Sequence, residues 1–309
     1  MEQRKFKPFG TVSALSLGGG GIGNVWGETT RSECVSTVNL AIESGINHLD
    51  VAPMYGKGEA ERVVGEALKG KRESVVIASK LSGSDHSESH ITDAIESSLR
   101  ALNVDYIDLY QLHSPQPQWP IQETMDTLIR LKNQGKIRHI GLSNYSPSQT
   151  KEAMQFGEIV SSQPRYNMLF TQEKETLKFC NDNDIGVIPH SVLAKGLLGG
   201  KYSPGHEFAP DDERRLFNFF KGQLFETIYA VTEKLKVWAI DRERDLIQLA
   251  IAWTIANPAV TSAIVGMKSV SQVENAAKAA TWKLTHEDLL DVDNIIGELR
   301  PLWIKDKGT

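Results

Sequence analysis

The chain has 309 residues, of which 40% are hydrophobic and 24% are charged, and its formal net charge is −5. This composition is typical of folded globular proteins and excludes disordered and collagen-like chains, while the negative charge and the lack of a basic run argue against a nucleic-acid partner. Two cysteines, Cys34 and Cys180, are too few for a disulfide framework, and no run of 18 apolar residues indicates a membrane span, so we expect a cytoplasmic protein.

Short apolar segments of strand length alternate along the chain with segments of helical period. The candidate strands are residues 15–17, 46–49, 75–78, 107–110, 140–142, 159–160, 186–188 and 263–265. The candidate helices between them are residues 34–44, 59–69, 90–102 and 122–133. In the third of these helices, Ile91, Ile95, Leu99 and Leu102 fall on one face at helical spacing.

Strands that are separated by helices pair in parallel, because a parallel neighbour needs a crossover of a dozen or more residues. Eight such units predict an α/β fold, a closed (β/α)8 TIM barrel that forms a single domain over residues 1–309. The interval after the seventh strand is longer, with an irregular stretch at residues 199–212 and helical segments at 217–236 and 246–256. We expect this insertion on the C-terminal face of the barrel, and an extra C-terminal helix at about residues 285–298 on its outside.

Chemically useful side chains stand at the ends of three neighbouring strands. Asp50 ends the second strand and is followed by Tyr55, while Lys80 ends the third strand and His113 the fourth. Because the C-terminal ends of barrel strands meet at one mouth, these four side chains should converge. A nearby ammonium favours the phenolate form of a tyrosine, and a carboxylate keeps a buried lysine charged. With a histidine to orient a carbonyl oxygen, the set suits carbonyl reduction.

Four segments of the chain resemble the aldo-keto reductase superfamily, and the resemblance extends from about residue 15 to residue 280. The segments are residues 45–56 (GINHLDVAPMYG), 78–80 (ASK), 110–115 (YQLHSP) and 141–145 (GLSNY). The resemblance implies that Asp50, Tyr55, Lys80 and His113 are a catalytic tetrad in which Tyr55 is the general acid. The long insertion and the GMK segment at 266–268 are most similar to the branch with bacterial general reductases and potassium-channel β subunits.

The same resemblance implies NADPH as the cofactor, with binding residues in three groups. Ser143, Asn144 and Gln163 match positions that hold the nicotinamide carboxamide, and His190 stands where an aromatic residue usually stacks on the ring. The residues that match the loop along the pyrophosphate are Ser191, Leu193, Lys195 and Gly196. The residues that match the region around the adenosine and its phosphate are Gly266, Lys268, Gln272 and Asn275.

Other motifs have simpler interpretations beside the functional one. The glycine run at residues 18–23 lacks the helix and acidic residue of a dinucleotide fingerprint, so we interpret it as a first loop that approaches cofactor or substrate. Trp26 and Trp119 follow the first and fourth strands and are candidates, with Tyr55 and His113, for lining the substrate pocket; packing on neighbouring residues is the alternative. Histidines in the acidic loop at residues 85–90 provide no fixed geometry for a metal, and we predict none.

The leading hypothesis is an NADPH-dependent reductase of a small aldehyde or ketone, in which the nicotinamide carries the hydride from C4 and Tyr55 protonates the product oxygen. A second hypothesis is a cofactor-binding regulatory subunit that senses redox state, which resemblance to channel β subunits allows. A third is a metal-dependent barrel hydrolase, but it leaves Lys80 and Tyr55 unexplained. The sequence identifies neither the substrate nor the oligomeric state.

Overall fold

A computed structural model describes residues 1–24, 29–210, 212–297 and 299 of the chain. Its central sheet consists of eight parallel strands in the order β10-β3-β4-β5-β6-β7-β8-β9. The strands are β3 Leu15–Gly18, β4 His48–Asp50, β5 Val76–Leu81, β6 Ile107–Leu112, β7 Ile137–Ser143, β8 Ser161–Gln163, β9 Gly186–Val187 and β10 Ala263–Gly266. Backbone hydrogen bonds from Thr261 to Val187 (2.7 Å) and from Ile264 to Pro189 (2.9 Å) connect the two end strands. The sheet is closed, and the predicted (β/α)8 barrel is confirmed.

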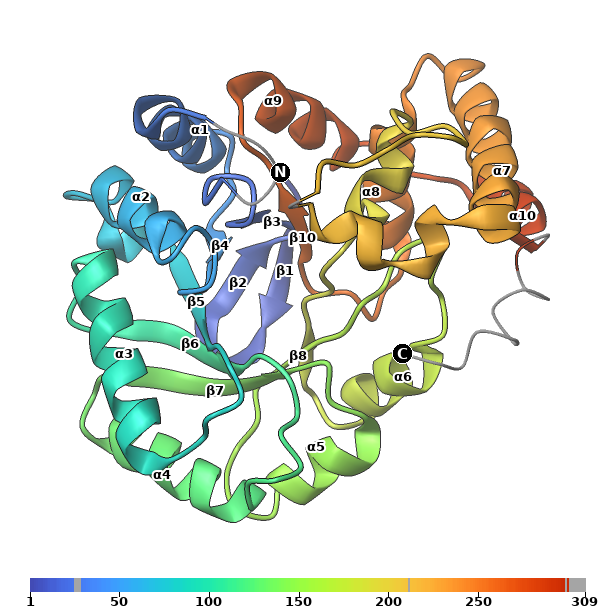
Figure 1. Ribbon diagram of the computed structural model, residues 1–309. Helices are drawn as coiled ribbons and strands as arrows, with labels where there is room; N and C mark the ends of the chain where they lie inside the picture. The colour runs from blue at the N-terminus through green and yellow to red at the C-terminus, as the bar shows by residue number, and fades with distance from the viewer. Residues whose placement is uncertain (25–28, 211, 298, 300–309) are drawn as a thin grey trace.

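Helices of the successive βα units surround the strands, as Figure 1 shows. They are α1 Arg31–Glu43, α2 Glu59–Ala67, α3 Glu88–Leu102, α4 Ile121–Asn133, α5 Pro147–Ala153, α6 Lys174–Asp182, α8 Leu246–Ala256 and α9 Val270–Ala279. Helix α3 illustrates why they form where they do. The Ser87 hydroxyl caps its first turn by accepting from the His90 amide, and the chain leaves the helix at Asn103 with a φ of 53°. Its predicted apolar face is buried against the barrel.

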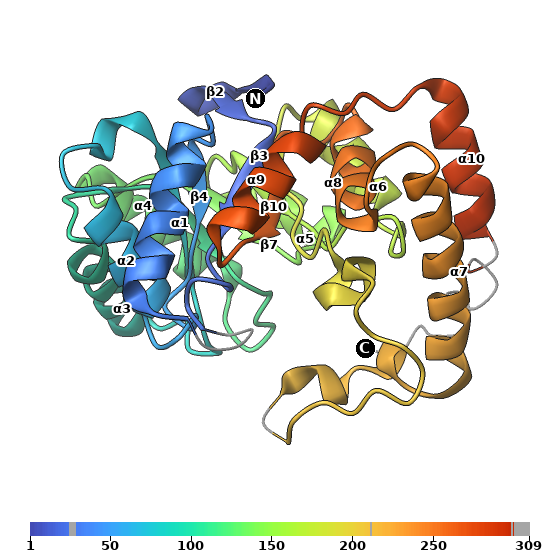
Figure 2. The same ribbon diagram turned by 90° about the horizontal axis from the view of Figure 1, so that it is seen from above.

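The connection between β9 and β10 forms the predicted insertion. It contains the short helices η3 Ala194–Gly199, η4 Glu213–Leu216 and η5 Asn218–Phe220, then α7 Gly222–Ile240 and α8. In Figure 2 the yellow and gold segment before α7 projects away from β2. It therefore lies on the C-terminal face of the barrel, because β2 lies at the N-terminal end. The last helix, α10 His286–Gly297, lies beside α7 in both views, and Arg242 after α7 forms an ion pair with Asp288 (3.1 Å). The predicted extra C-terminal helix is thus on the outside of the barrel.

An N-terminal hairpin was not predicted from the sequence. Strands β1 Gln3–Phe6 and β2 Gly10–Ser13 pair antiparallel, with Phe6 opposite Gly10. Phe6 and Val12 are buried and pack with inward-facing side chains of the barrel strands, including Leu109 and Ile188. A Cβ atom at Gly186 would lie 2.3 Å from Cε2 of Phe6, so a side chain there would displace the ring. The hairpin therefore closes the N-terminal end of the barrel.

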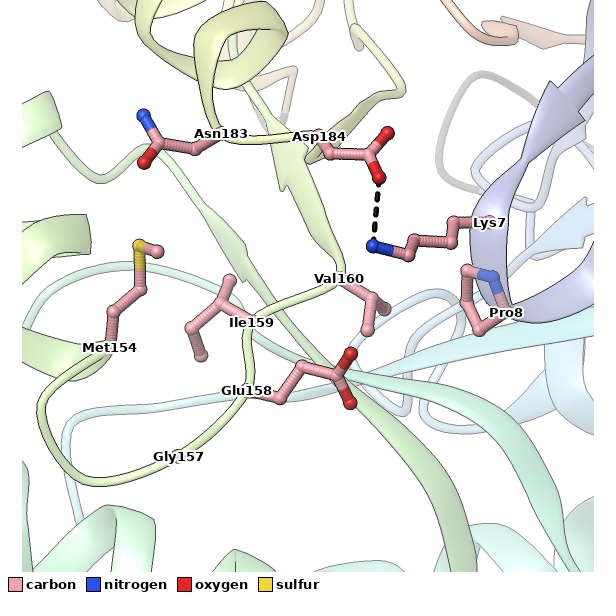
Figure 3. A pocket seen from close by; sticks show the side chains of 9 residues that line it. All are labelled: Lys7, Pro8, Met154, Gly157, Glu158, Ile159, Val160, Asn183 and Asp184. Carbon is pink, nitrogen blue, oxygen red and sulfur yellow. Dashed lines mark ion pairs between the residues drawn. The ribbon is translucent and has the colours of Figure 1, made fainter.

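The turn of this hairpin carries an ion pair at the surface. Lys7 Nζ lies 2.8 Å from a carboxylate oxygen of Asp184, beside a pocket of about 190 Å³ that is shown in Figure 3. The side chains of Lys7 and Asp184 are 70% and 72% exposed. An exposed pair of this kind is screened by water and adds little to stability. The buried side chains of Phe6 and Val12 therefore contribute more to the attachment of the hairpin than this pair does.

One predicted strand was misplaced. The apolar pair at residues 159–160 predicted the sixth strand, but β8 begins one residue later, at Ser161. The side chains of Ser161 and Gln163 point into the barrel, where Gln163 is hydrogen-bonded to other buried polar groups, while Ser162 between them faces the other way. Hydrophobic periodicity cannot detect a strand whose inward side chains are polar.

No helix among the described residues is long and apolar enough to cross a bilayer.

Candidate active site

A cleft of about 1140 Å³ opens at the C-terminal ends of the strands. Polar lining residues come from the ends of β4, β6, β7, β8, β9 and β10 and from the insertion, and Gly18 to Gly21 after β3 contribute backbone. The predicted residues in the lining are Asp50, Tyr55, His113, Ser143, Asn144, Gln163, His190, Ser191, Leu193, Lys195, Gly196, Gly266, Lys268 and Gln272. Residues far apart in the sequence thus face one cavity, as expected for the mouth of a barrel.

Asp50, Lys80, Tyr55 and His113 lie together at the inner end of this cleft. The Lys80 ammonium donates to Asp50 Oδ1 at 2.6 Å and to the backbone oxygen of Val51 at 3.0 Å. The Tyr55 side chain lies beside the same ammonium, with Lys80 Nζ 5.2 Å from the centre of its ring. The rings of Tyr55 and His113 stand perpendicular, with their centroids 6.3 Å apart. The structure therefore brings the four predicted catalytic residues into one cluster.

The surroundings fix the charge of two members of the cluster. Burial acts to lower the pKa of the Lys80 ammonium, but the charge of Asp50 and the contact with Tyr55 outweigh it and hold this pKa above its ordinary value. Burial, assisted by the charge of Lys80, lowers the pKa of His113 to about 4. Near neutral pH the lysine is therefore a cation and the histidine is neutral.

The second oxygen of Asp50 is held by two amides. Gln163 Nε2 donates to Asp50 Oδ2 at 2.9 Å, and Gln111 Nε2 donates to the same oxygen at 3.2 Å. Gln111 belongs to the YQLHSP segment and has no role among the residues predicted from the sequence. The signal was a polar amide at a buried position of strand β6, two residues before His113. Its partners could not be read from the sequence, because they lie on other strands.

The backbone after β4 places Tyr55 at the mouth. Gly56 follows it with a φ of 62°, a left-handed conformation that favours glycine. A Cβ atom on Gly56 would lie 2.2 Å from the backbone oxygen of Gly23, so the first loop also passes close to this turn. Any other residue at position 56 would strain the turn and displace Tyr55.

The residues predicted to hold the nicotinamide form a connected group. Asn144, at a φ of 61°, donates to the backbone oxygen of His113 (3.0 Å) and to the Ser143 hydroxyl (3.1 Å). Its Oδ1 lies 2.9 Å from Nε2 of His190, and Nδ1 of that ring lies 2.9 Å from the Ser191 hydroxyl. Burial, together with the charge of Lys80, lowers the pKa of His190 to about 3. The ring is therefore neutral, and both of its nitrogens are engaged with side-chain neighbours.

The loop after β9 has an unusual backbone. Ser191, Ala194 and Lys195 have φ values of 57°, 48° and 54°, and Gly196 has a φ of 99°. Strained backbone of this kind is concentrated at binding sites. Lys195 Nζ lies 4.3 Å from the centre of the Phe217 ring, which also lines the cleft. This contact connects the loop to the later part of the insertion.

Two of the predicted binding residues in the described part of the chain do not line the cleft. Among the described residues, Asn275 is bonded to Gln248 (2.7 Å) and to Asp245 (2.8 Å) at the start of α8 and is not part of the lining. The Trp119 indole donates to the backbone oxygen of Ser84 at 2.8 Å, also away from the lining. Trp26 lies outside the described residues. The described part of the chain contains no group of three His, Cys, Asp or Glu side chains placed to hold a metal ion.

The charges of the cleft fit a phosphorylated dinucleotide. The cationic residues of the described lining are Arg165, Lys195, Lys201, Arg214 and Lys268, and the acidic ones are Asp50 and Glu173. The cleft is therefore cationic although the chain as a whole carries −5. A Cβ atom on Gly266 would meet nothing within 4 Å, so the wall beside Lys268 is open to a ligand. Cations and an open wall suit the phosphates of a dinucleotide.

Several known proteins are similar to this chain over most of its length. The chain is 35% identical over 299 residues to aldo-keto reductase YhdN of Bacillus subtilis, covering 92% of this chain and 90% of that protein. It is 32% identical over 304 residues to the NADH-specific methylglyoxal reductase of Escherichia coli, covering 90% and 93%. It is also 32% identical over 270 residues to a probable voltage-gated potassium channel subunit beta of Arabidopsis thaliana, covering 80% and 81%. The predicted resemblance to both groups is confirmed.

Solved structures show the same barrel. The glycerol dehydrogenase of Gluconobacter oxydans matches with a TM-score of 0.86 and 30% identity over 96% of this chain and 95% of that one. An aldo/keto reductase from Klebsiella pneumoniae, crystallised in complex with NADP and acetate, matches with a TM-score of 0.76 and 27% identity over 95% of each chain. The profile of the Aldo/keto reductase family matches residues 14–296. The chain is therefore a member of the aldo/keto reductase family.

Proposed function

We propose that this member of an oxidoreductase family reduces a small aldehyde or ketone with NADPH, and that Tyr55 donates the proton. The observation that carries the proposal is the buried Asp50–Lys80 ion pair, whose ammonium lies beside Tyr55, with the neutral His113 next to the same ring. When bound, the nicotinamide supplies a hydride, and the chain has to supply the proton and the orientation.

Tyr55 has the position of a proton donor because its hydroxyl lies at the mouth of the cleft and is backed by a fixed cation. As the phenol gives up its proton to the carbonyl oxygen, negative charge develops on the phenol oxygen. The Lys80 ammonium stabilises that charge, and Asp50 keeps the ammonium protonated inside the barrel. The transferred proton is later replaced from solvent.

His113 orients the substrate in this proposal. Its imidazole is neutral near pH 7, so only one ring nitrogen carries a proton. The Ser82 hydroxyl lies 3.5 Å from Nδ1, which leaves Nε2 to donate to the carbonyl oxygen. A hydrogen bond from this side fixes the direction of the carbonyl group while Tyr55 approaches the same oxygen.

The same cleft supplies the cofactor contacts. Ser143, Asn144 and Gln163 would hold the carboxamide, and the neutral ring of His190 would stack on the nicotinamide. The loop with Ser191, Leu193, Lys195 and Gly196 would follow the pyrophosphate. Gly266, Lys268 and Gln272 would hold the adenosine end, where Lys268 is placed to pair with a 2′-phosphate. One relative is named as NADH-specific, so the preference for NADPH requires its own measurement.

The test is a screen of aldehydes, ketones, sugars and diols in which NADPH consumption is followed by absorbance. We expect turnover with a subset of carbonyl compounds. Tyr55→Phe should then lower turnover by roughly 10²-fold or more, the range expected of general acid catalysis, while NADPH binding stays close to wild type. Retained turnover in this variant would overturn the role of Tyr55.

The similarity to a probable potassium channel subunit supports a second candidate, a regulatory subunit whose bound cofactor reports redox state to a partner protein. The two candidates differ in catalysis. Rapid turnover with simple aldehydes favours the reductase. Tight NADPH binding without turnover on any compound of the screen would favour the regulatory subunit.

A further inference from the structure

Gln111 is a fully buried glutamine of β6 that contacts both Asp50 and Gln163. We infer that Gln111 is a positioning residue that fixes the side-chain amide of Gln163 with its oxygen toward the cleft and so selects a cofactor that carries a carboxamide. The inference rests on the proposed function, because it concerns the cofactor of that site. It assigns a role to a residue that does not itself touch the cofactor.

The first step is the orientation of the two amides. A carboxylate only accepts hydrogen bonds, so each glutamine must turn its NH2 group toward Asp50. The distances to Asp50 Oδ2 are 2.9 Å from Gln163 Nε2 and 3.2 Å from Gln111 Nε2. Asp50 is 2% exposed and its other oxygen is occupied by Lys80, so the carboxylate is enclosed by protein donors. The charge of Asp50 therefore sets the direction of both amides.

The second step is the remaining proton of Gln163. Its Nε2 also lies 3.2 Å from Oε1 of Gln111, so one N–H is directed to Asp50 and the other to Gln111. Gln163 lines the cleft, and the group that it has left for a ligand is its oxygen. Without the Gln111 oxygen, one N–H would lose its partner in the barrel and could turn toward the ligand instead.

The third step concerns the ligand. An amide oxygen facing the cleft accepts a hydrogen bond, and a nicotinamide carboxamide offers an NH2 group to donate. The 3-acetylpyridine analogue of NADP⁺ carries a methyl group in place of that NH2 group. Against a fixed acceptor the analogue loses a hydrogen bond and leaves a buried oxygen unsatisfied. The wild-type protein should therefore bind NADP⁺ more tightly than the analogue.

The experiment compares the affinities of NADP⁺ and its 3-acetylpyridine analogue by calorimetry in wild type and Gln111→Met. Methionine keeps the length of the side chain but removes both the donor and the acceptor. The matched control is Tyr110→Phe, because Tyr110 is the adjacent buried residue of β6 and its hydroxyl has no hydrogen-bond partner among the described residues. A general disturbance of β6 would affect both variants.

We expect wild type and Tyr110→Phe to favour NADP⁺ by roughly five- to tenfold, as for the loss of one hydrogen bond, and Gln111→Met to reduce the ratio to about twofold or less. An unchanged ratio in Gln111→Met would overturn the inference but leave the proposed function intact. Failure of wild type to bind either dinucleotide would instead overturn the proposed function. Should Gln111→Met fail to fold, Gln111→Asn, which keeps the amide but shortens its reach, should show the same loss of discrimination.

Discussion

The two ends of the barrel are built from the same strands but differ in the side chains that fill them. At the N-terminal end, Phe6 of the hairpin packs with apolar strand residues such as Leu109. At the C-terminal end, the same strand β6 carries Gln111, two residues further on, in a buried network with Asp50 and Lys80. The apolar end contributes stability through burial. The polar end encloses charges that are costly to bury, and it is where the chemistry is proposed to occur.

The position of an inward-facing residue along a strand decides whether it contributes to stability or to the proposed chemistry. A buried polar group is tolerated only where its hydrogen bonds are satisfied, and Asp50 has three side-chain donors within 3.2 Å. Substitutions at the polar end should therefore change activity and stability together. Those at the apolar end should change stability alone.

The largest expected effect is at the polar end. Lys80→Met removes the cation but leaves the Asp50 carboxylate buried, so it should destabilise the protein by about 3–5 kcal/mol and lower kcat/KM by roughly 10²-fold or more. Urea unfolding and steady-state kinetics measure the two effects. The double variant Asp50→Asn/Lys80→Met contains no unpaired charge and should recover most of the stability but none of the activity. Recovery of activity would show that the pair is structural only.

The apolar end provides the contrasting test. Phe6→Ala leaves a cavity under the barrel and should destabilise the protein by about 3–5 kcal/mol, with kcat/KM within about twofold of wild type where the protein remains folded. The matched control is Phe9→Ala, because Phe9 is only partly buried beside Phe6 and should cost less. A large loss of kcat/KM in Phe6→Ala would mean that the two ends are not independent.

A buried histidine in the barrel interior, His48, should make the stability of the protein depend on pH. Burial lowers the pKa of His48 from 6.5 to about 4, and its Nδ1 lies 2.7 Å from the Ser16 hydroxyl. The unfolded chain therefore binds the proton more tightly, and stability should fall as the pH drops from about 6.5 to 4, by about 3 kcal/mol for this residue. Urea unfolding at several pH values gives the free energy of unfolding as a function of pH. In His48→Asn this free energy should fall less steeply as the pH drops than in wild type. The same pH dependence in both proteins would mean that His48 does not contribute to the loss of stability at low pH.

The smallest predicted effect concerns the rim of the polar end. Lys268→Ala should weaken NADPH binding by roughly tenfold and NADH binding little, because only NADPH carries the 2′-phosphate. Lys201→Ala removes another lysine of the same cleft and should change both affinities alike. Titration of each variant with both cofactors measures the ratio. If Lys268→Ala leaves the ratio unchanged, another residue discriminates between the cofactors.

Much of the fold and the catalytic cluster could be predicted from the sequence, because both leave local signals. Apolar runs alternate with helical periods, and Asp50, Lys80 and His113 stand next to strand ends. The N-terminal hairpin was missed, since Arg4 and Lys5 interrupt the apolar pattern and its burial depends on the barrel that it closes. Likewise, Asn275 has its partners at the start of α8, 27 and 30 positions away. Contacts of this kind are set by packing and leave no periodic signal.

The role of Gln111 also depends on contacts between strands that are distant in the sequence. Its amide is one residue among several polar strand ends, and only the arrangement around Asp50 distinguishes it. A polar residue at an inward position of a strand is a usable signal for a site residue, but its partner has to come from the structure.

In the proposed mechanism Tyr55, supported by Lys80, is the proton donor, and His113 only orients the substrate. The most direct test is the pH dependence of kcat/KM for wild type, His113→Gln and Lys80→Met, across the range in which a phenol titrates. We expect His113→Gln to be slower by on the order of 10²-fold but to keep the ionisation of the proton donor, while Lys80→Met shifts or loses that ionisation. Loss of that ionisation in His113→Gln, with its retention in Lys80→Met, would contradict the account and make His113 the donor.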